Sequence, residues 1–412
     1  MTKEKKNVPN VRFEGFEEEW EQRKVSTIAK KTYGGGTPKT IVAKYWDGDI
    51  PWIQSSDLSQ DELSNVKPKK YITKEAVNNS ATKLIPAYSI AIVTRVGVGK
   101  LAFMPYQYTT SQDFLSLSEL TLDHNFGIYV LYKKLQNELN NVQGTSIKGI
   151  TKNELMEKTI NSPINKNEQK EIGNFFKQLD NLITLHQRKI DLLKSLKQGY
   201  LRYLFANVDK GIPTLHFNNQ TNKWQQEKLS YFLETSTLKN IDNVFSKKDV
   251  LSVSGDFGIV NQIDFQGRSF AGVSVTQYGI VNTHDIVYTK SPLKSSPYGI
   301  IKVNRGKDGI VSTLYAVYTP KNNTNPEFVE YYFSNKYRLN KYLKPLVNKG
   351  AKNDMKVSDD NALVGKIIFP LKQEQEKIST FFKQLDKLIT FHQQKTDKIT
   401  QLKQAYLQNM FI

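Results

Sequence analysis

Several side chains of this chain could carry out catalysis, but their spacing matches none of the common catalytic motifs. Gly97-Val98-Gly99-Lys100 lacks the glycine spacing of a phosphate-binding loop and the Ser or Thr that follows its lysine. Asp359-Asp360 has no matching lysine motif for a metal nuclease, and Asp is typical of a helix start. An Asn-Pro-Pro-aromatic motif, which a DNA methyltransferase would need, is absent. The five histidines lack metal-ligand spacing (His124, His186, His216, His284 and His392). We therefore predict no catalytic residue, no metal site and no cofactor in this chain.

A second group of side chains has the chemistry to bind nucleic acid. Lys and Arg on loops neutralise phosphates, and Gln, Ser, Thr and Arg can hydrogen-bond base edges. In the first half of the chain the candidates are Thr37, Lys39, Gln54, Ser55, Arg95, Lys100, Ser111, Gln112 and Lys148. In the second half they are Gln277, Tyr278, Lys290, Lys294, Ser295, Ser296, Arg305, Lys352 and Lys356. Each of them alone could instead be an ordinary solvated surface residue, so the argument depends on the set.

Composition is consistent with a nucleic-acid partner. The 412 residues carry a formal net charge of +18, which favours a polyanionic partner, either nucleic acid or an anionic membrane. The chain has no cysteine, which excludes disulfides and thiolate metal sites. No apolar run approaches the roughly 18–20 residues that span a bilayer. We therefore expect a cytoplasmic protein that does not enter the membrane, and the length suggests two or three domains.

The segments that must position these side chains form an internal repeat in the sequence. Residues 168–205 match residues 374–411 at one constant offset, and both copies contain Phe-Phe-Lys-Gln-Leu-Asp. A second echo lies upstream, where Pro9, Phe13 and Trp20 correspond to Pro213, Phe217 and Trp224. Between these echoes, residues 30–150 and 234–350 differ from one another. A shared framework with different inserts indicates two modules that dock alike and recognise different things, and the alternative is a duplication that drifted without purpose.

The repeated segments have the periodicity of long helices. Apolar residues alternate at spacings of 3 and 4, which predicts a left-handed coiled coil. Helices of about 39 residues would be about 58 Å long, and a two-fold relation between the repeats would pack them antiparallel. His186 and His392 occupy equivalent positions and are interpreted as polar residues that fix the register.

The apolar stripe on each helix is wider than a two-stranded seam needs. We expect it to dock a partner protein through Phe175, Phe176, Leu179, Ile183, Phe381, Phe382, Leu385 and Ile389. The e positions, Phe176 and Phe382, are expected to face the partner. The alternative is burial against the globular parts of the same chain.

Together these features resemble the specificity (S) subunits of type I restriction-modification enzymes over nearly the whole chain. The resemblance rests on the Pro-Phe-Trp segment at 9–20 and its match at 213–224, on Gly-Gly-Thr-Pro at 35–38, and on Trp-Asp-Gly-Asp-Ile-Pro-Trp at 46–52. It also rests on the Pro-containing segments before Glu-Gln at 163–169 and 370–375. The second block lacks the Gly-Gly-Thr-Pro and Ile-Pro-Trp motifs, so its recognition domain is of another subtype.

The resemblance implies an assembly as well as a fold. Two target-recognition domains would each read one half of a bipartite double-stranded DNA site, and the helices would dock two methyltransferase (M) subunits. Those subunits would carry S-adenosylmethionine, and restriction (R) subunits that use ATP and Mg could join them. The expected fold is α+β, with two globular mixed α/β target-recognition domains separated by two long repeated helices packed as an antiparallel coiled coil with pseudo-two-fold symmetry.

The repeats also set the expected domain boundaries. Target-recognition domain 1 takes residues 1–160, the first helical spacer 161–206 and a linker 207–222; domain 2 takes 223–365 and the second spacer 366–412. Two other interpretations stay open, an autonomous DNA-modifying enzyme and a coiled-coil scaffold without sequence-specific recognition. Co-purification with a methyltransferase would separate the three.

Overall fold

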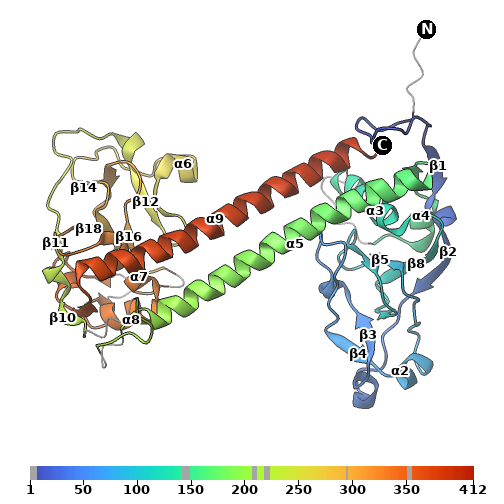
Figure 1. The fold of residues 1–412 in the computed structure, drawn as a ribbon, viewed down its shortest axis with the longest axis horizontal. Coiled ribbons are helices and arrows are strands. Elements are labelled where there is room, and N and C mark those ends of the chain that lie inside the picture. Colours follow the sequence, from blue (N-terminus) through green and yellow to red (C-terminus); the bar gives the residue numbers. More distant parts are fainter. Residues whose placement is uncertain (1–6, 142–148, 207–210, 218–222, 294–295, 350–354) are drawn as a thin grey trace, which may run out of the picture. The chain divides into compact units, whose positions relative to one another are not determined.

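The computed structural model describes residues 7–141, 149–206, 211–217, 223–293, 296–349 and 355–412 (Figure 1). The chain forms two compact units. Unit 1 consists of residues 1–188 and 393–412, and unit 2 consists of residues 189–392. Each unit thus combines one stretch of mixed α/β structure with the first part of one long helix and the last part of the other. The boundaries predicted above for the recognition domains stay a prediction.

Unit 1 is built around a four-stranded antiparallel sheet in the order β2-β8-β5-β6. All five residues of its strand β5 are buried, which explains their unbroken apolar character apart from Ser89. A second sheet has the order β4-β3-β7, and β1 pairs with β9. The strands are β1 Glu21–Lys24, β2 Ala29–Gly34, β3 Ile50–Ile53, β4 Lys70–Ile72, β5 Ser89–Val93, β6 Leu101–Met104, β7 Thr109–Thr110, β8 Phe114–Leu120 and β9 Thr159–Ser162. The helices are α1 Val25–Ile28, α2 Lys74–Asn78, α3 His124–Asn141, α4 Lys152–Glu157 and the long α5 Lys166–Tyr203, with short 3₁₀ helices η1 Ala43–Trp46 and η2 Ser55–Asp57.

Unit 2 repeats this plan with other residues. Its four-stranded antiparallel sheet has the order β11-β18-β15-β16, and β10 pairs with β21 as β1 pairs with β9. The strands are β10 Gln225–Lys228, β11 Leu233–Thr235, β12 Leu251–Ser254, β13 Gly258–Asn261, β14 Gly279–Val281, β15 Ile286–Thr289, β16 Ile301–Val303, β17 Gly309–Val311, β18 Tyr315–Pro320, β19 Asn348–Lys349, β20 Met355–Lys356 and β21 Lys366–Phe369. The helices are α6 Gln262–Gln266, α7 Pro326–Ser334, α8 Lys336–Leu343 and the long α9 Lys372–Asn409, with η3 Leu229–Tyr231, η4 Lys247–Asp249 and η6 Asn361–Leu363.

The two long helices pack antiparallel within each unit. In unit 1 the Phe175 ring, early in α5, meets the Tyr406 ring, late in α9, with centroids 5.0 Å apart. In unit 2 the Tyr200 ring, late in α5, meets the Phe381 ring, early in α9, at 4.8 Å. The predicted fold class and the packing of the two helices are confirmed. None of the helices in the described ranges is long and apolar enough to cross a membrane.

The cores explain why both ends of each repeated segment are aromatic. In unit 1, Phe411 at the end of the chain packs against Trp20, Phe126 and Phe176, with ring centroids 5.5–6.4 Å apart. In unit 2, Phe205 packs against the equivalent rings of Trp224, Phe328 and Phe382 at 5.2–6.4 Å. The end of each long helix is therefore part of the core that anchors the start of the other helix.

Candidate nucleic-acid interface

A polar triad joins each module to both long helices. In unit 1 the Tyr129 hydroxyl of α3 donates to Asp180 of α5 at 2.6 Å, and Lys403 of α9 pairs with the same carboxylate at 2.5 Å. The Lys403 ammonium also lies 5.6 Å from the centre of the Tyr129 ring. Burial, followed by the neighbouring Asp180 charge, raises the pKa of Tyr129, so its hydroxyl stays a donor.

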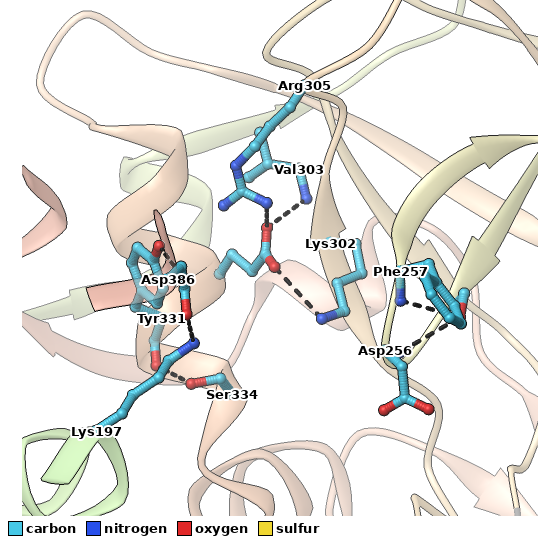
Figure 2. Close-up of polar contacts among 11 residues, drawn as sticks. Lys197, Asp256, Phe257, Lys302, Val303, Arg305, Tyr331, Ser334 and Asp386 are labelled. Carbon is cyan, nitrogen blue, oxygen red and sulfur yellow. Dashed lines mark hydrogen bonds and ion pairs between the residues drawn. The ribbon is translucent and has the colours of Figure 1, made fainter. Parts of the chain in front are cut away.

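Unit 2 contains the same triad (Figure 2). The Tyr331 hydroxyl of α7 donates to Asp386 at 2.9 Å, and Lys197 pairs with Asp386 at 2.5 Å. Burial and the nearby Asp386 charge raise the pKa of Tyr331 as well. An ion pair with a third hydrogen-bonding partner accepts few alternative registers, so the triad helps to fix how the helices and the module meet in each unit. The pair is buried in unit 1 and partly exposed in unit 2.

The Glu-Gln pair at the start of each long helix holds the same contacts in both units. The amide of Gln169 donates to the Pro163 carbonyl oxygen at 2.8 Å, and the amide of Gln375 donates to the Pro370 carbonyl oxygen at 2.9 Å. The carbonyl oxygens of these two amides accept the backbone N–H groups that precede α3 and α7, each at 2.9 Å. The Pro-containing segments of the sequence are therefore docking points between the helices and the modules.

The neighbouring glutamates differ between the units. Glu168 accepts from the Trp20 indole at 3.2 Å and forms a two-pronged pair with Arg12 at 2.7 and 2.8 Å. Glu374 accepts from the Trp224 indole at 3.3 Å, but the position equivalent to Arg12 is His216. Burial raises the pKa of Glu374, opposed by the Trp224 hydrogen bond and by His216.

The Gly-Gly-Thr-Pro motif brings two predicted DNA-binding residues together in unit 1. Thr37 donates its hydroxyl hydrogen bond to Gln112 at 2.6 Å, and both side chains are exposed. The two central glycines pass so close to other backbone that a Cβ at Gly35 would lie 1.9 Å from the Ser111 carbonyl oxygen. A Cβ at Gly36 would lie 2.5 Å from the Thr82 nitrogen. Only glycine fits at these positions, and this close approach presents Thr37 beside Gln112.

The other candidates of unit 1 divide into exposed and structural residues. Arg95, two residues after β5, and Lys39 are exposed, whereas Gln54 and Ser55 are half-buried at η2. The Lys100 ammonium is held within the fold, because it donates to the Leu58 carbonyl oxygen at 2.9 Å and to that of Ser55 at 3.3 Å. Its assignment as a DNA contact stays a prediction.

Ser111 also has a partner within the fold, and its assignment as a DNA contact stays a prediction. Its side chain is buried, and its hydroxyl donates to Asp113 at 3.2 Å within the turn before β8. Lys148 lies outside the described residues.

Fewer candidates of unit 2 face solvent. Gln277 is exposed and Tyr278 is half-buried, and Arg305 is exposed although it pairs with Glu330 at 2.9 Å. Ser296 is buried, and its backbone N–H donates to the Leu293 carbonyl oxygen at 3.0 Å, so its assignment as a DNA contact stays a prediction. Lys290 is likewise held in the fold, since it pairs with Asp359 at 2.8 Å. Lys294, Ser295 and Lys352 lie outside the described residues, as does the side chain of Lys356.

One protein family matches both halves of the chain. The family model of the type I restriction modification DNA specificity domain matches the chain twice, over residues 17–195 and 224–401. The chain belongs to this family. The described residues contain no group of three or more His, Cys, Asp or Glu side chains that could hold a metal ion.

Known members of the family align with part of the chain. The specificity subunit of the type I restriction enzyme MjaIX of Methanocaldococcus jannaschii is 28% identical over 200 residues, which are 46% of this chain and 45% of that protein. The EcoR124I/EcoR124II specificity subunit of Escherichia coli is 33% identical over 191 residues, 43% of this chain and 46% of that protein. The chain spans about half the length of the curated relatives it matches.

Solved structures of the family share the fold over the full length. The S subunit of the type I restriction-modification system from M. genitalium has a TM-score of 0.61 at 15% identity, covering 98% of this chain and 99% of that one. A chain from a solved type I restriction-modification system has a TM-score of 0.51 at 13% identity, covering 94% and 96%. At these identities the likeness shows the fold alone.

The predicted docking stripe of this specificity-domain protein needs correction. Phe176 and Phe382 are completely buried in the cores of their own units, so they do not face a partner, and Leu385 is also buried. The reason is that Phe411 and Phe205, from the ends of the opposite helices, cover these positions. Phe175, Leu179, Ile183, Phe381 and Ile389 are half-buried.

Different apolar residues of the helices are exposed. Leu182 and Leu185 of α5 are 44% and 48% exposed, and their repeat equivalents Leu388 and Phe391 of α9 are 47% and 50% exposed. Leu182 and Leu388 belong to the alternating 3–4 apolar pattern that predicted the coiled coil, yet both are partly exposed. Each of these leucines is followed three positions later by a second apolar residue, Leu185 in the first repeat and Phe391 in the second. Residues three apart lie on the same face of a helix, so this repeated pair could have predicted an exposed apolar patch.

Sequence reasoning also missed an exposed apolar residue and a lysine–tryptophan cluster in unit 1. Ile41 is 90% exposed, and the ammonium of Lys70 lies 5.5 and 5.6 Å from the ring centres of Trp46 and Trp52. The Trp-Asp-Gly-Asp-Ile-Pro-Trp motif supplies both rings. Because the buried Trp52 indole donates to the Gly36 carbonyl oxygen at 3.0 Å, the motif also supports the glycine segment that precedes Thr37.

Proposed function

We propose that this chain is the sequence-specific DNA-binding specificity subunit of a type I restriction-modification complex, and that each unit reads one half of a bipartite target. The observation that carries the proposal is that the same set of contacts attaches two modules to the long helices, although the modules expose different residues. We call this set of contacts the framework. Tyr–Asp–Lys, Trp–Glu and Gln–Pro contacts occur in both units with nearly equal distances. A framework of this kind positions two readers alike while leaving each free to recognise its own bases.

The exposed polar residues supply the chemistry of recognition. In unit 1 the Thr37–Gln112 pair can hydrogen-bond base edges, and Lys39 and Arg95 can pair with phosphates or with guanine. In unit 2 Gln277 is the exposed amide with the same capacity. The formal charge of +18 favours the approach of the DNA polyanion.

A selection from a randomised duplex library tests this function, using the chain co-expressed with its methyltransferase subunit. The expected product has two specified segments separated by a gap of unspecified sequence. Recovery of one continuous site would refute the two-reader model, and recovery of no preferred sequence would favour a scaffold.

The chain itself is proposed to be non-catalytic. Methyl transfer from S-adenosylmethionine belongs to the methyltransferase subunits, and ATP- and Mg-dependent steps belong to restriction subunits. The highly purified chain alone is expected to transfer no methyl group and to bind no S-adenosylmethionine. Methylation of DNA by the chain alone would establish an autonomous enzyme and refute this part of the proposal.

The exposed helix residues are proposed to dock two methyltransferase subunits, one on each repeat. Leu182 and Leu185 in unit 1, and Leu388 and Phe391 in unit 2, form equivalent apolar patches on the long helices. Exposed apolar residues at helical spacing are typical of a surface that another protein covers. Because the repeats are equivalent, the same partner can occupy both sites.

The substitutions Leu182→Asp and Leu388→Asp test this docking. The double variant should keep its helical circular dichroism spectrum and lose both methyltransferase subunits in analytical ultracentrifugation. Leu371→Asp is the matched control, because Leu371 is also exposed but precedes α9. Full methyltransferase binding by the double variant, or equal loss in the control, would place the partner elsewhere.

A further inference from the structure

Each unit contains a hollow at the same place beside its helix pair. The hollow of unit 1 is lined by Asp180, Ile183, Thr184, Lys403, Gln404 and Leu407, together with Tyr132 and the loop at 59–64. The hollow of unit 2 is lined by the repeat equivalents Asp386, Ile389, Thr390, Lys197, Gln198 and Leu201. Their volumes are about 460 and 770 Å³, which lie within the range of about 300–1,000 Å³ that is typical of small-molecule sites.

The walls that face the helices differ in charge. In unit 1 the loop at 59–64 contributes the acidic side chains of Asp61 and Glu62 to the lining of the hollow. Thr400 of unit 1 is the repeat equivalent of Lys194 in unit 2. In unit 2 the far wall brings Lys302, Arg305 and Lys336. All lining residues included, five cations and three carboxylates surround the hollow of unit 2, whereas two cations and three carboxylates surround that of unit 1.

One buried carboxylate organises the cations of unit 2 (Figure 2). Glu330 accepts from the Val303 backbone at 3.0 Å, and pairs with Arg305 at 2.9 Å and with Lys302 at 3.4 Å. In Figure 2, dashed lines from Arg305, Val303 and Lys302 meet at one unlabelled carboxylate, and Lys197 and Asp386 form a separate pair beside it. Two cations share a single carboxylate, so their combined charge is only half balanced.

The remaining two cations are unpaired among the residues that the structure describes. Lys194 of α5 and Lys336 of α8 line the hollow, and no described carboxylate lies within 4.0 Å of either ammonium group. Two free ammonium groups beside a half-balanced pair give the hollow an excess of positive charge that the equivalent hollow lacks. Such an arrangement attracts a compact anion with several acceptor oxygens.

We propose that the hollow of unit 2 binds a phosphate group, with Lys194 and Lys336 as its main partners, and that the hollow of unit 1 does not. The phosphate comes either from the backbone of bound DNA or from a free phosphorylated molecule such as a nucleotide. Because only one unit carries the site, its occupant is not a segment shared by two equivalently docked subunits. The DNA source rests on the proposed function, whereas binding of the free anion does not.

Calorimetric titration of the full chain with sodium pyrophosphate tests the site. Wild type should bind one equivalent, and the Lys194→Gln, Lys336→Gln variant should bind at least about tenfold more weakly. The matched control is Lys189→Gln with Lys341→Gln, which removes two exposed charges from the same helices outside the hollow and should change the affinity less than about twofold. Unchanged affinity in the first variant, or equal loss in the control, would overturn the proposal.

The same variants distinguish the source of the phosphate. A loss of affinity for all duplex sequences with a smaller dependence on salt, next to the loss of pyrophosphate binding, assigns the site to DNA backbone phosphate. Lost pyrophosphate binding with unchanged DNA binding assigns it to a free phosphorylated molecule. If the chain fails to bind DNA at all, the proposed function fails while the pyrophosphate result still decides the site. No pyrophosphate binding by wild type refutes the inference.

Discussion

Unit 1 and unit 2 attach their modules to the long helices through the same buried contacts, but the surfaces that those modules present differ. The four-stranded sheets have the same strand order, and Tyr129–Asp180–Lys403 is matched by Tyr331–Asp386–Lys197. By contrast, Thr37 and Gln112 of unit 1 have no equivalent motif in unit 2, and the hollows beside the helices differ in charge. Most residues that join the modules to the helices are thus repeated, while the residues that the modules themselves present to solvent vary between the units.

The framework itself is not identical in strength. Lys403 of unit 1 is 8% exposed and its partner Asp180 is 16% exposed, whereas Lys197 and Asp386 of unit 2 are 22% and 40% exposed. Glu168 has the two-pronged Arg12, whereas Glu374 has His216, whose Nδ1 is buried with no hydrogen-bond partner among the described residues. Unit 1 therefore has the tighter joint with the helices, and substitutions at equivalent positions should affect the two units unequally.

The largest effect is expected from the buried phenylalanines. Phe176→Ala should destabilise unit 1, and Phe382→Ala should destabilise unit 2, each by about 3–5 kcal/mol, because both rings are completely buried. Hydrogen exchange should show the loss in the substituted unit. Phe391→Ala is the control, since that ring is half-exposed and should change the free energy of unfolding by less than about 1 kcal/mol. If the amides of both units exchanged as slowly in the two core variants as in wild type, the two rings could not be part of the cores.

A smaller and unequal effect is expected at the triads. Asp180→Asn leaves the buried Lys403 ammonium without its carboxylate and should cost about 3 kcal/mol in unit 1. Asp386→Asn should cost about 1 kcal/mol in unit 2, because solvent already screens that pair. The measurement is the free energy of unfolding of each unit from exchange of the α3 and α7 amides. Equal losses of unfolding free energy in both units would show that burial does not decide how much each triad contributes to stability.

The smallest effects are expected from exchanging Arg12, beside Glu168, and His216, beside Glu374, for one another. Arg12→His should cost unit 1 about 2 kcal/mol, and His216→Arg should stabilise unit 2 by about 1 kcal/mol near neutral pH. Since burial raises the pKa of Glu374, its charge costs stability above that pKa and the cost disappears as pH falls through it. The advantage of His216→Arg should therefore be full at neutral pH and shrink on acidification.

The pKa of the Glu374 carboxyl, followed by NMR, checks this directly. It should decrease in the His216→Arg variant. An unchanged pKa would mean that the new guanidinium does not reach the carboxylate.

The sequence predicted the elements that depend on repetition and periodicity. The long helices begin and end close to the predicted residues, because their apolar pattern persists over many turns. The Val-Ser-Val-Thr-Gln segment at 273–277 has the alternating β-branched pattern that is typical of a strand, but the segment forms no ladder and only Val275 is buried. Apolar and β-branched residues alone did not reveal that its side chains face solvent.

Side-chain roles were harder to predict than elements. Lys100, Ser111, Lys290 and Ser296 have the chemistry of DNA contacts, yet their partners are loop carbonyls and carboxylates that lie far away in the sequence or within their own turns. The orientation of Phe176 depends on Phe411 at the other end of the chain, which no local pattern encodes. Which face of a helix is covered is a property of the tertiary fold.

Exchange of one module tests the central claim most directly. Residues 30–150 would be replaced by the corresponding block of a relative, and the preferred DNA of the assembled complex would be selected from a randomised library. The repeated framework predicts that one half of the target changes while the other half stays as in wild type. A change in both halves, or in neither, would contradict the account that each unit reads its own half-site.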